Sequence, residues 1–333
     1  MRHLLLIAAL CAAPVYAGDL QPGQVASSGD RGCQFDALPV PGGFAIYDHA
    51  GGLLHQQPPS PGASTLRDLI ALGGRIVGVP DGGTNESSIE TIDADGNRAP
   101  FTAHLPGLTS ASIAGLAPAG RDAIYAVVAG DRGAEVWRID RAGGVTLKRQ
   151  LPDARNIPGS LIGLDTDASG CTLYYPTNDS NGHIARFNVC SGVALADFGG
   201  GSYAAAGLRL LPDGGILMHD LSKLRRYDRN GALVRELPLN VLFPPPSPEY
   251  FASIEGIALD PDPHFVWLLV SDGNPCGGSI PLLVNLDSAQ AVNSPFPNFA
   301  LNRYLSLAVA GGWSAAISSA PPPRRRAAVP PEN

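Results

Sequence analysis

Acidic and amide side chains recur where an apolar strand is expected to end, and this is the pattern in the chain that best suits a polar or metal site. Its members are Asp81, Asp131, Asn178, Asp179, Asp220 and Asp272. Oxygen ligands without thiolates favour calcium or magnesium over zinc. Most members also precede a glycine closely, which is typical of an Asp that caps its own turn. We assign Asp81, Asp131, Asn178 and Asp179 to ligand binding and Asp220 and Asp272 to a divalent-cation site, with turn capping as the alternative.

Two further carboxylates, Asp68 and Glu255, occupy one equivalent position of an expected inner strand. The other strands carry an apolar residue there, namely Ala114, Ile162, Ala206 and Leu305. A carboxylate at such a position faces a channel or is buried at a cost. Asp68 and Glu255 are therefore candidates to hold a cation or share a proton. The alternative is a structural pair held by arginine or backbone partners.

His219 is the single histidine at the end of such a strand, which makes it the candidate general acid or base. Glu255 is the second candidate catalytic residue. The sequence has no GxSxG, HExxH, P-loop or GxGxxG string. Several reaction classes are thereby weakened, and whether the protein is an enzyme is left open.

The first 17 residues combine Arg2, an apolar run and small residues before Gly18, as a secretory signal peptide does. The run is too short for a membrane span, which needs about 20 apolar residues. We expect export to the periplasm or the medium. The net charge of −7 and the lack of a basic stripe disfavour nucleic acid. The Pro- and Arg-rich residues 320–333 are expected to form a disordered tail.

A short motif repeats along the chain. It consists of alternating apolar residues that end in Asp or Asn and are followed by a turn that contains glycine. It places Asp48, Asp93, Asp140, Asn188, Asp228 and Asp287 at its end. A period of roughly 45 residues with four short strands per unit is typical of a β-propeller. We predict one all-β domain over residues 18–319, a six-bladed propeller of four-stranded antiparallel blades. Seven blades are the alternative, if residues 18–41 hide extra strands.

The ring is expected to close through strands from both ends of the chain. The hairpin around Asp48 lacks its inner pair, and Tyr304–Ala308 and Trp313–Ile317 match that pair. Cys171 and Cys190 fall in the first and third turns of one blade, whereas Cys33 and Cys276 fall near the opposite face. We therefore predict the disulfides Cys171–Cys190 and Cys33–Cys276, the second across the closing seam.

The segment from Ile254 to Asp262, with Leu268 to Gly273, resembles a blade of the esterase-like phytase family. The wider repeat, including Leu211-Pro212-Asp213-Gly214-Gly215, resembles NHL and SMP-30/gluconolactonase-like propellers. The SMP-30-like resemblance implies a metal-binding Glu, which Glu255 matches by its Glu-Gly context. The Asn and Asp that complete that family's metal triad have no counterpart on the other inner strands.

Two functions follow as hypotheses. The first is an exported, monomeric scaffold without a membrane span that binds a small polar molecule or a protein partner at its top face, with or without a bound calcium ion or other divalent cation. The second is a metal-dependent ester, phosphoester or lactone hydrolase that uses Glu255, Asp272, Asp220 and His219.

Overall fold

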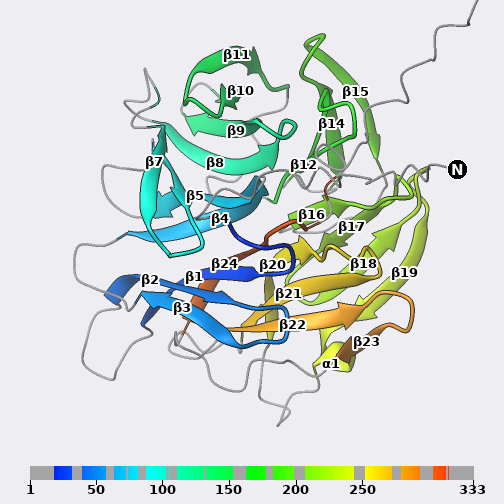
Figure 1. Cartoon of the computed structure of the whole chain (residues 1–333). Coiled ribbons are helices and arrows are strands. Elements are labelled where there is room, and N and C mark those ends of the chain that lie inside the picture. Colours follow the sequence, from blue (N-terminus) through cyan, green and yellow to red (C-terminus); the bar gives the residue numbers. More distant parts are fainter. Residues whose placement is uncertain are drawn as a thin grey trace, which may run out of the picture.

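The computed structural model describes residues 19–31, 40–57, 64–72, 74–81, 88–102, 105, 111–130, 133–152, 163–177, 183–198, 207–243, 252–271, 279–292, 303–312 and 314. These residues form six four-stranded antiparallel sheets around a common axis (Figure 1), so the predicted six-bladed propeller is confirmed. The one helix among the described residues, α1 (Leu239–Leu242), is short and follows the fifth blade. No helix in the described part of the chain is long and apolar enough to cross a bilayer.

The blades are numbered in chain order, and each is given from the axis outward. Blade 1 is β24 (Arg303–Val309), β1 (Val25–Arg31), β2 (Val40–Tyr47) and β3 (Leu53–Gln57); blade 2 is β4 (Thr65–Leu72), β5 (Arg75–Asp81), β6 (Ile89–Ile92) and β7 (Arg98–Thr102); blade 3 is β8 (Ala111–Pro118), β9 (Ala123–Gly130), β10 (Gly133–Asp140) and β11 (Val145–Gln150). Blade 4 is β12 (Asp165–Thr166), β13 (Thr172–Pro176), β14 (Ile184–Asn188) and β15 (Val193–Phe198); blade 5 is β16 (Gly207–Leu210), β17 (Ile216–His219), β18 (Lys223–Tyr227) and β19 (Leu233–Pro238); blade 6 is β20 (Ser253–Leu259), β21 (Phe265–Ser271), β22 (Ser279–Asn285) and β23 (Gln290–Val292).

The hydrophobic core lies between neighbouring blades. One cluster joins Val127 of blade 3 to Leu173 of blade 4, and another joins Leu217 of blade 5 to Leu268 of blade 6. Second strands such as β17 are buried on both faces, because a blade packs on each side of them. Outer strands such as β19 are largely exposed. Apolar runs therefore form the middle of each blade, and alternating or polar runs form its rim.

The repeated turns have the hairpin geometry that the sequence predicts. The Oδ1 atom of Asp140 accepts hydrogen bonds from the backbone N–H groups of Ala142, at 3.0 Å, and Gly144, at 2.8 Å. Gly143 between them has φ +81°, a conformation that favours glycine. The turn after β18 repeats this pattern around Asp228. The repeated Asp thus caps its own turn.

The closing blade takes three strands from the N-terminal part of the chain and one from the C-terminal part. Strand β1 lies between β24 and β2 and pairs with both. The prediction that Trp313–Ile317 supplies the second strand is wrong, because Val25–Arg31 fills that place; Ser314 is described and is in no strand. The strand hidden in residues 18–41 thus completes blade 1 and does not begin a seventh blade.

The disulfide Cys171–Cys190 is confirmed, with an S–S distance of 1.99 Å. It links the first and third turns of blade 4. Cys33 and Cys276 lie outside the described residues, so their pairing stays a prediction.

Candidate functional site

A β-bulge interrupts the inner strand of four blades at the position where the sequence places Asp68 and Glu255. The register skips Asp68 and Leu69 in β4, Ala114 in β8, Glu255 in β20 and Leu305 in β24. Bulges redirect side chains and occur often beside functional sites. The equivalence inferred from the sequence is therefore physical: these residues occupy one ring around the axis.

Asp68 is the most unusual member of this ring. Its φ of +48° lies in the left-handed region, which few non-glycine residues adopt. One carboxylate oxygen accepts a hydrogen bond from the backbone N–H of Leu116 on the next inner strand. Burial raises the pKa of Asp68 to about 6, although Arg209, that hydrogen bond and Arg67 act in the opposite direction. Asp68 is thus a carboxyl group that can gain a proton close to neutral pH.

Three residues beyond the bulge, the inner strands form a second ring that the sequence analysis missed. It consists of Ala71, Ala117, Asp165, Arg209, Ala258 and Ala308. Two neighbouring blades, the fourth and fifth, place opposite charges where the other four blades have alanine. The signal was available in the sequence: Gly163-Leu164-Asp165 and Gly207-Leu208-Arg209 depart from Gly115-Leu116-Ala117.

These two charged side chains are fixed by backbone groups. The Asp165 carboxylate accepts hydrogen bonds from the N–H groups of Thr166, at 2.8 Å, and Leu210, at 2.9 Å. The Nη1 atom of Arg209 donates to the carbonyl oxygens of Leu208, at 2.8 Å, and Leu164, at 3.1 Å. Burial raises the pKa of Asp165, and the Arg209 guanidinium opposes that shift. Each group thus bridges two blades and has a set orientation.

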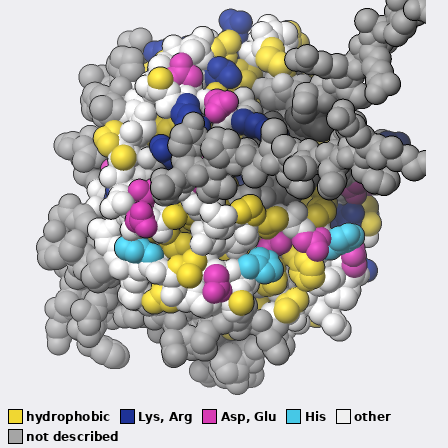
Figure 2. All heavy atoms as spheres, viewed as in Figure 1, with side chains coloured by type: hydrophobic (Ala, Val, Ile, Leu, Met, Phe, Trp, Pro, Cys, Tyr) yellow, Lys and Arg dark blue, Asp and Glu magenta, His cyan; other side chains and the backbone are white. Residues whose placement is uncertain are grey.

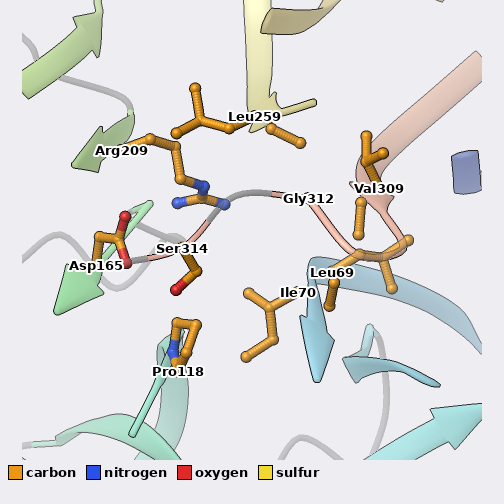
Figure 3. Close-up of a pocket in the computed structure, with 12 residues that line it drawn as sticks. Leu69, Ile70, Pro118, Asp165, Arg209, Leu259, Val309, Gly312 and Ser314 are labelled. Carbon is orange, nitrogen blue, oxygen red and sulfur yellow. The ribbon is translucent and has the colours of Figure 1, made fainter. Parts of the chain in front are cut away.

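An axial cavity of about 40 Å³ opens beside this pair (Figure 3). All six inner strands or the segments that follow them contribute to its wall, which combines polar and apolar surface. Asp165, Arg209 and Ser314 provide its polar side chains, and Figure 3 shows Arg209 and Asp165 directed into it from one side. We call Asp68, Asp165 and Arg209 the axial cluster.

His219 ends β17 and is buried, with 1% of its surface exposed. Burial lowers its pKa to about 4, so its ring is neutral at neutral pH. Its Nδ1 lies 3.3 Å from the carbonyl oxygen of Asp220. A Cβ atom added to Gly207 would lie 2.7 Å from its Nε2. The imidazole is thus packed against the inner strand that carries Arg209, which adds to the lowering of its pKa.

Asp220 lies in a second polar group, away from the axis. Its Oδ1 caps the following turn through the N–H groups of Ser222 and Lys223, and its Oδ2 accepts a hydrogen bond from Arg225 at 2.6 Å. Arg225 also binds Glu236 at 2.8 Å, and Glu236 binds Lys223 at 2.6 Å. We call Asp220, Lys223, Arg225 and Glu236 the rim network.

The structure describes some of the remaining predicted site residues and not others. Glu255 is half-buried on β20 and has an interaction partner. Asp131, Asn178, Asp179 and Asp272 lie outside the described residues, and nothing is described of the Asp81 side chain. No group of three or more His, Cys, Asp or Glu side chains suited to a metal occurs among the described residues. The divalent-cation site stays a prediction.

A polar contact also crosses the closing seam between blades 1 and 6. The Nε2 atom of His49 lies 2.9 Å from an oxygen of the buried Asp260, and that oxygen accepts a hydrogen bond from Trp267 at 2.8 Å. His264 makes a similar pair with Asp287 at 2.7 Å on exposed turns. Figure 2 shows histidine side chains beside acidic ones on the face that it presents.

Comparison with known proteins establishes the fold. No family model and no curated protein matches the chain. A protein of unknown function from Bacteroides caccae is similar in structure, with a TM-score of 0.60 and 12% identity over 86% of this chain and 98% of that one. TolB from Acinetobacter baumannii is similar with a TM-score of 0.56 and 15% identity; the match covers 86% of this chain and 66% of TolB. The likeness to NHL, SMP-30-like and phytase-like families stays a prediction.

Proposed function

We propose that the protein is an exported binding scaffold whose ring of blades holds a small polar ligand at the axis. The observation that carries this proposal is the axial cluster, where charged groups are fixed by hydrogen bonds from neighbouring blades. Groups that are already immobile lose little entropy when a ligand binds. Export is supported by the disulfide of blade 4 and by the signal-peptide pattern.

The arrangement of polar groups favours binding over hydrolysis. A general base at neutral pH needs a pKa close to 7 and access to a substrate. His219 is buried with a pKa of about 4, and both Asp220 oxygens are used by the turn and by Arg225. The hydrolase hypothesis therefore depends on Glu255 and on loop residues outside the described part of the chain. Ligand binding by Asp81, Asp131, Asn178 and Asp179 is a separate prediction.

The proposal is tested by thermal unfolding of the mature protein in a panel of small polar molecules grouped by charge. The variant is Arg209→Met, which keeps much of the side-chain volume and removes the charge. The control is Arg226→Met, which removes a partly exposed cation of the same blade that pairs with Asp213.

At least one class of molecule should raise the unfolding temperature of the wild type and of Arg226→Met but not of Arg209→Met. An equal response from all three proteins would place binding elsewhere and refute the axial site.

A further inference from the structure

The polar part of the axial cavity has an unusual property: its two opposite charges are close but do not pair. The Asp165 side chain is buried, with 2% of the residue exposed, and Arg209 is half-buried. Buried opposite charges usually form a direct ion pair, because an uncompensated charge in the interior is costly. No nitrogen of Arg209 lies within 4 Å of a carboxylate oxygen among the residues that the structure describes, although the two groups interact electrostatically.

The reason lies in the backbone bonds that hold each side chain. One nitrogen of Arg209 is held by two carbonyl oxygens, and each oxygen of Asp165 is held by one N–H group. These four bonds, two of which link blades 4 and 5, fix the position of each charged group. The Nε and Nη2 atoms of Arg209 have no hydrogen-bond partner in the described part of the chain. Each Asp165 oxygen also has a lone pair left, because a carboxylate oxygen accepts two hydrogen bonds.

The alanines of the same ring leave the space that a ligand needs. Ala71, Ala258 and Ala308 line the cavity where longer side chains would fill it. Its volume of about 40 Å³ exceeds the roughly 10–15 Å³ that one water requires. Leu69 and Val309 line the side of the cavity that faces Arg209 and Asp165, and Leu259 lies beside Arg209, as Figure 3 shows. A small molecule with a short apolar part fits this shape.

The charge around the cavity decides which class of ligand suits it. Arg209 acts electrostatically on both Asp68 and Asp165, and Arg67 acts on Asp68, so these four groups sum to a formal charge of zero when all are ionised. A lone anion on Arg209 would face both carboxylates, and a lone cation on Asp165 would face the guanidinium. A ligand with one positive and one negative end is compensated at both ends and leaves the net charge unchanged.

We propose that the axial cavity binds a small zwitterion of the α-amino acid type, with its carboxylate on Arg209 and its ammonium group on Asp165. This proposal rests on the proposed binding function and specifies its ligand class. The Arg209 guanidinium presents two free N–H directions to a carboxylate, a geometry that recognises planar anions. Ser314 adds a hydroxyl group to the same wall.

The test uses isothermal calorimetry on the mature protein with three probes of similar size: glycine as the zwitterion, acetate as the anion and methylammonium as the cation. Glycine should bind the wild type about tenfold or more tightly than either partial analogue, since each loses one charged hydrogen-bonded contact. Asp165→Asn and Arg209→Met should each weaken glycine binding by a similar factor. The control Arg226→Met should bind glycine as the wild type does.

Each other outcome is decisive. Acetate or methylammonium binding as tightly as glycine, with loss in Arg209→Met or Asp165→Asn, would overturn the zwitterion and leave the axial binding function standing. No heat from any probe, together with no Arg209-dependent ligand in the wider panel, would overturn both this proposal and the proposed binding function. Should Arg209→Met fail to fold, Asp165→Asn decides the ligand class alone: unchanged glycine binding would refute the proposal.

Discussion

The axial cluster and the rim network use the same residue types in opposite ways. At the rim, Arg225 touches Asp220 at 2.6 Å, and turn N–H groups together with Arg225 lower the pKa of that carboxyl despite its burial. At the axis, burial dominates and raises the pKa of Asp68 and of Asp165, because Arg209 is held away from them. Asp220 and Arg225 contact each other directly and thereby serve the fold. Asp165 and Arg209 do not contact each other, so each of them can still contact a ligand. Perturbed groups beside a cavity are better candidates for function than equally buried groups that are satisfied.

The largest expected effect comes from breaking the rim network. Arg225→Met should lower the free energy of unfolding by about 3–5 kcal/mol, because Asp220 and Glu236 would lose the buried cation that both contact. Urea unfolding at pH 7.5 measures this change. A loss below about 1 kcal/mol would show that the network is not structural.

The same variant series tests the predicted cation site. If Asp220 serves the fold through Arg225 and the turn, Asp220→Asn should destabilise the protein equally with calcium and with a chelator. Stabilisation of the wild type by calcium that is lost in Asp220→Asn, or in Glu255→Ala, would instead support the divalent cation that the sequence predicts.

The opposite sign is expected at the axis. The pKa of Asp68 is about 6 in the folded protein against 3.8 for the unperturbed group, so folding binds a proton between these values. Its contribution is favourable below pH 3.8 and is lost as the pH rises through 6. Asp68→Asn should therefore stabilise the protein at pH 8 by up to about 3 kcal/mol, a gain that fades towards pH 4. The control is Asp140→Asn, which makes the same chemical change in a turn. An effect of Asp68→Asn on stability that does not vary with pH would contradict this account.

The sequence was enough to predict the blades, because their turns carry a local signal. Asp140 caps its turn and Gly143 adopts positive φ whatever the neighbouring blade does, so spacing alone counts the units. Which segments form the strands of the closing blade could not be predicted from local sequence. Val25–Arg31 lies between strands from the two ends of the chain, and its pairing depends on contacts far apart in sequence.

The site was predicted in part, for a related reason. The equivalence of Asp68 and Glu255 followed from strand alignment, and the β-bulges give it a physical basis. Asp165 and Arg209 were missed because an acidic residue and an arginine on different blades show their relation only when the ring is assembled. The burial of His219 was also beyond the sequence, since it depends on how closely β16 packs against it.

That packing yields the next prediction. A Cβ atom at position 207 would lie 2.7 Å from His219 Nε2 and 3.2 Å from its Cδ2, so Gly207→Ala should cost about 1–3 kcal/mol. The matched control is Gly256→Ala, where the nearest atom is Leu269 Cβ at an ordinary 3.4 Å. Urea unfolding of both variants measures the difference. Equal losses would mean that β16 can shift, and that the orientation of Arg209 is less fixed than its backbone bonds imply.

The smallest effect is expected at the exposed edge of the rim network and shows where charge pairing stops contributing. Lys223 contacts Glu236 at 2.6 Å, but their side chains are 37% and 33% exposed. Lys223→Met should cost less than about 1 kcal/mol, because water screens the pair and Arg225 still holds Glu236. High salt should reduce even that loss, while leaving the Arg225→Met loss largely intact. If salt reduced the stability losses of Lys223→Met and Arg225→Met equally, burial would not distinguish Arg225 from Lys223. The contrast between the rim network and the axial cluster would then rest only on the distances between their charged groups.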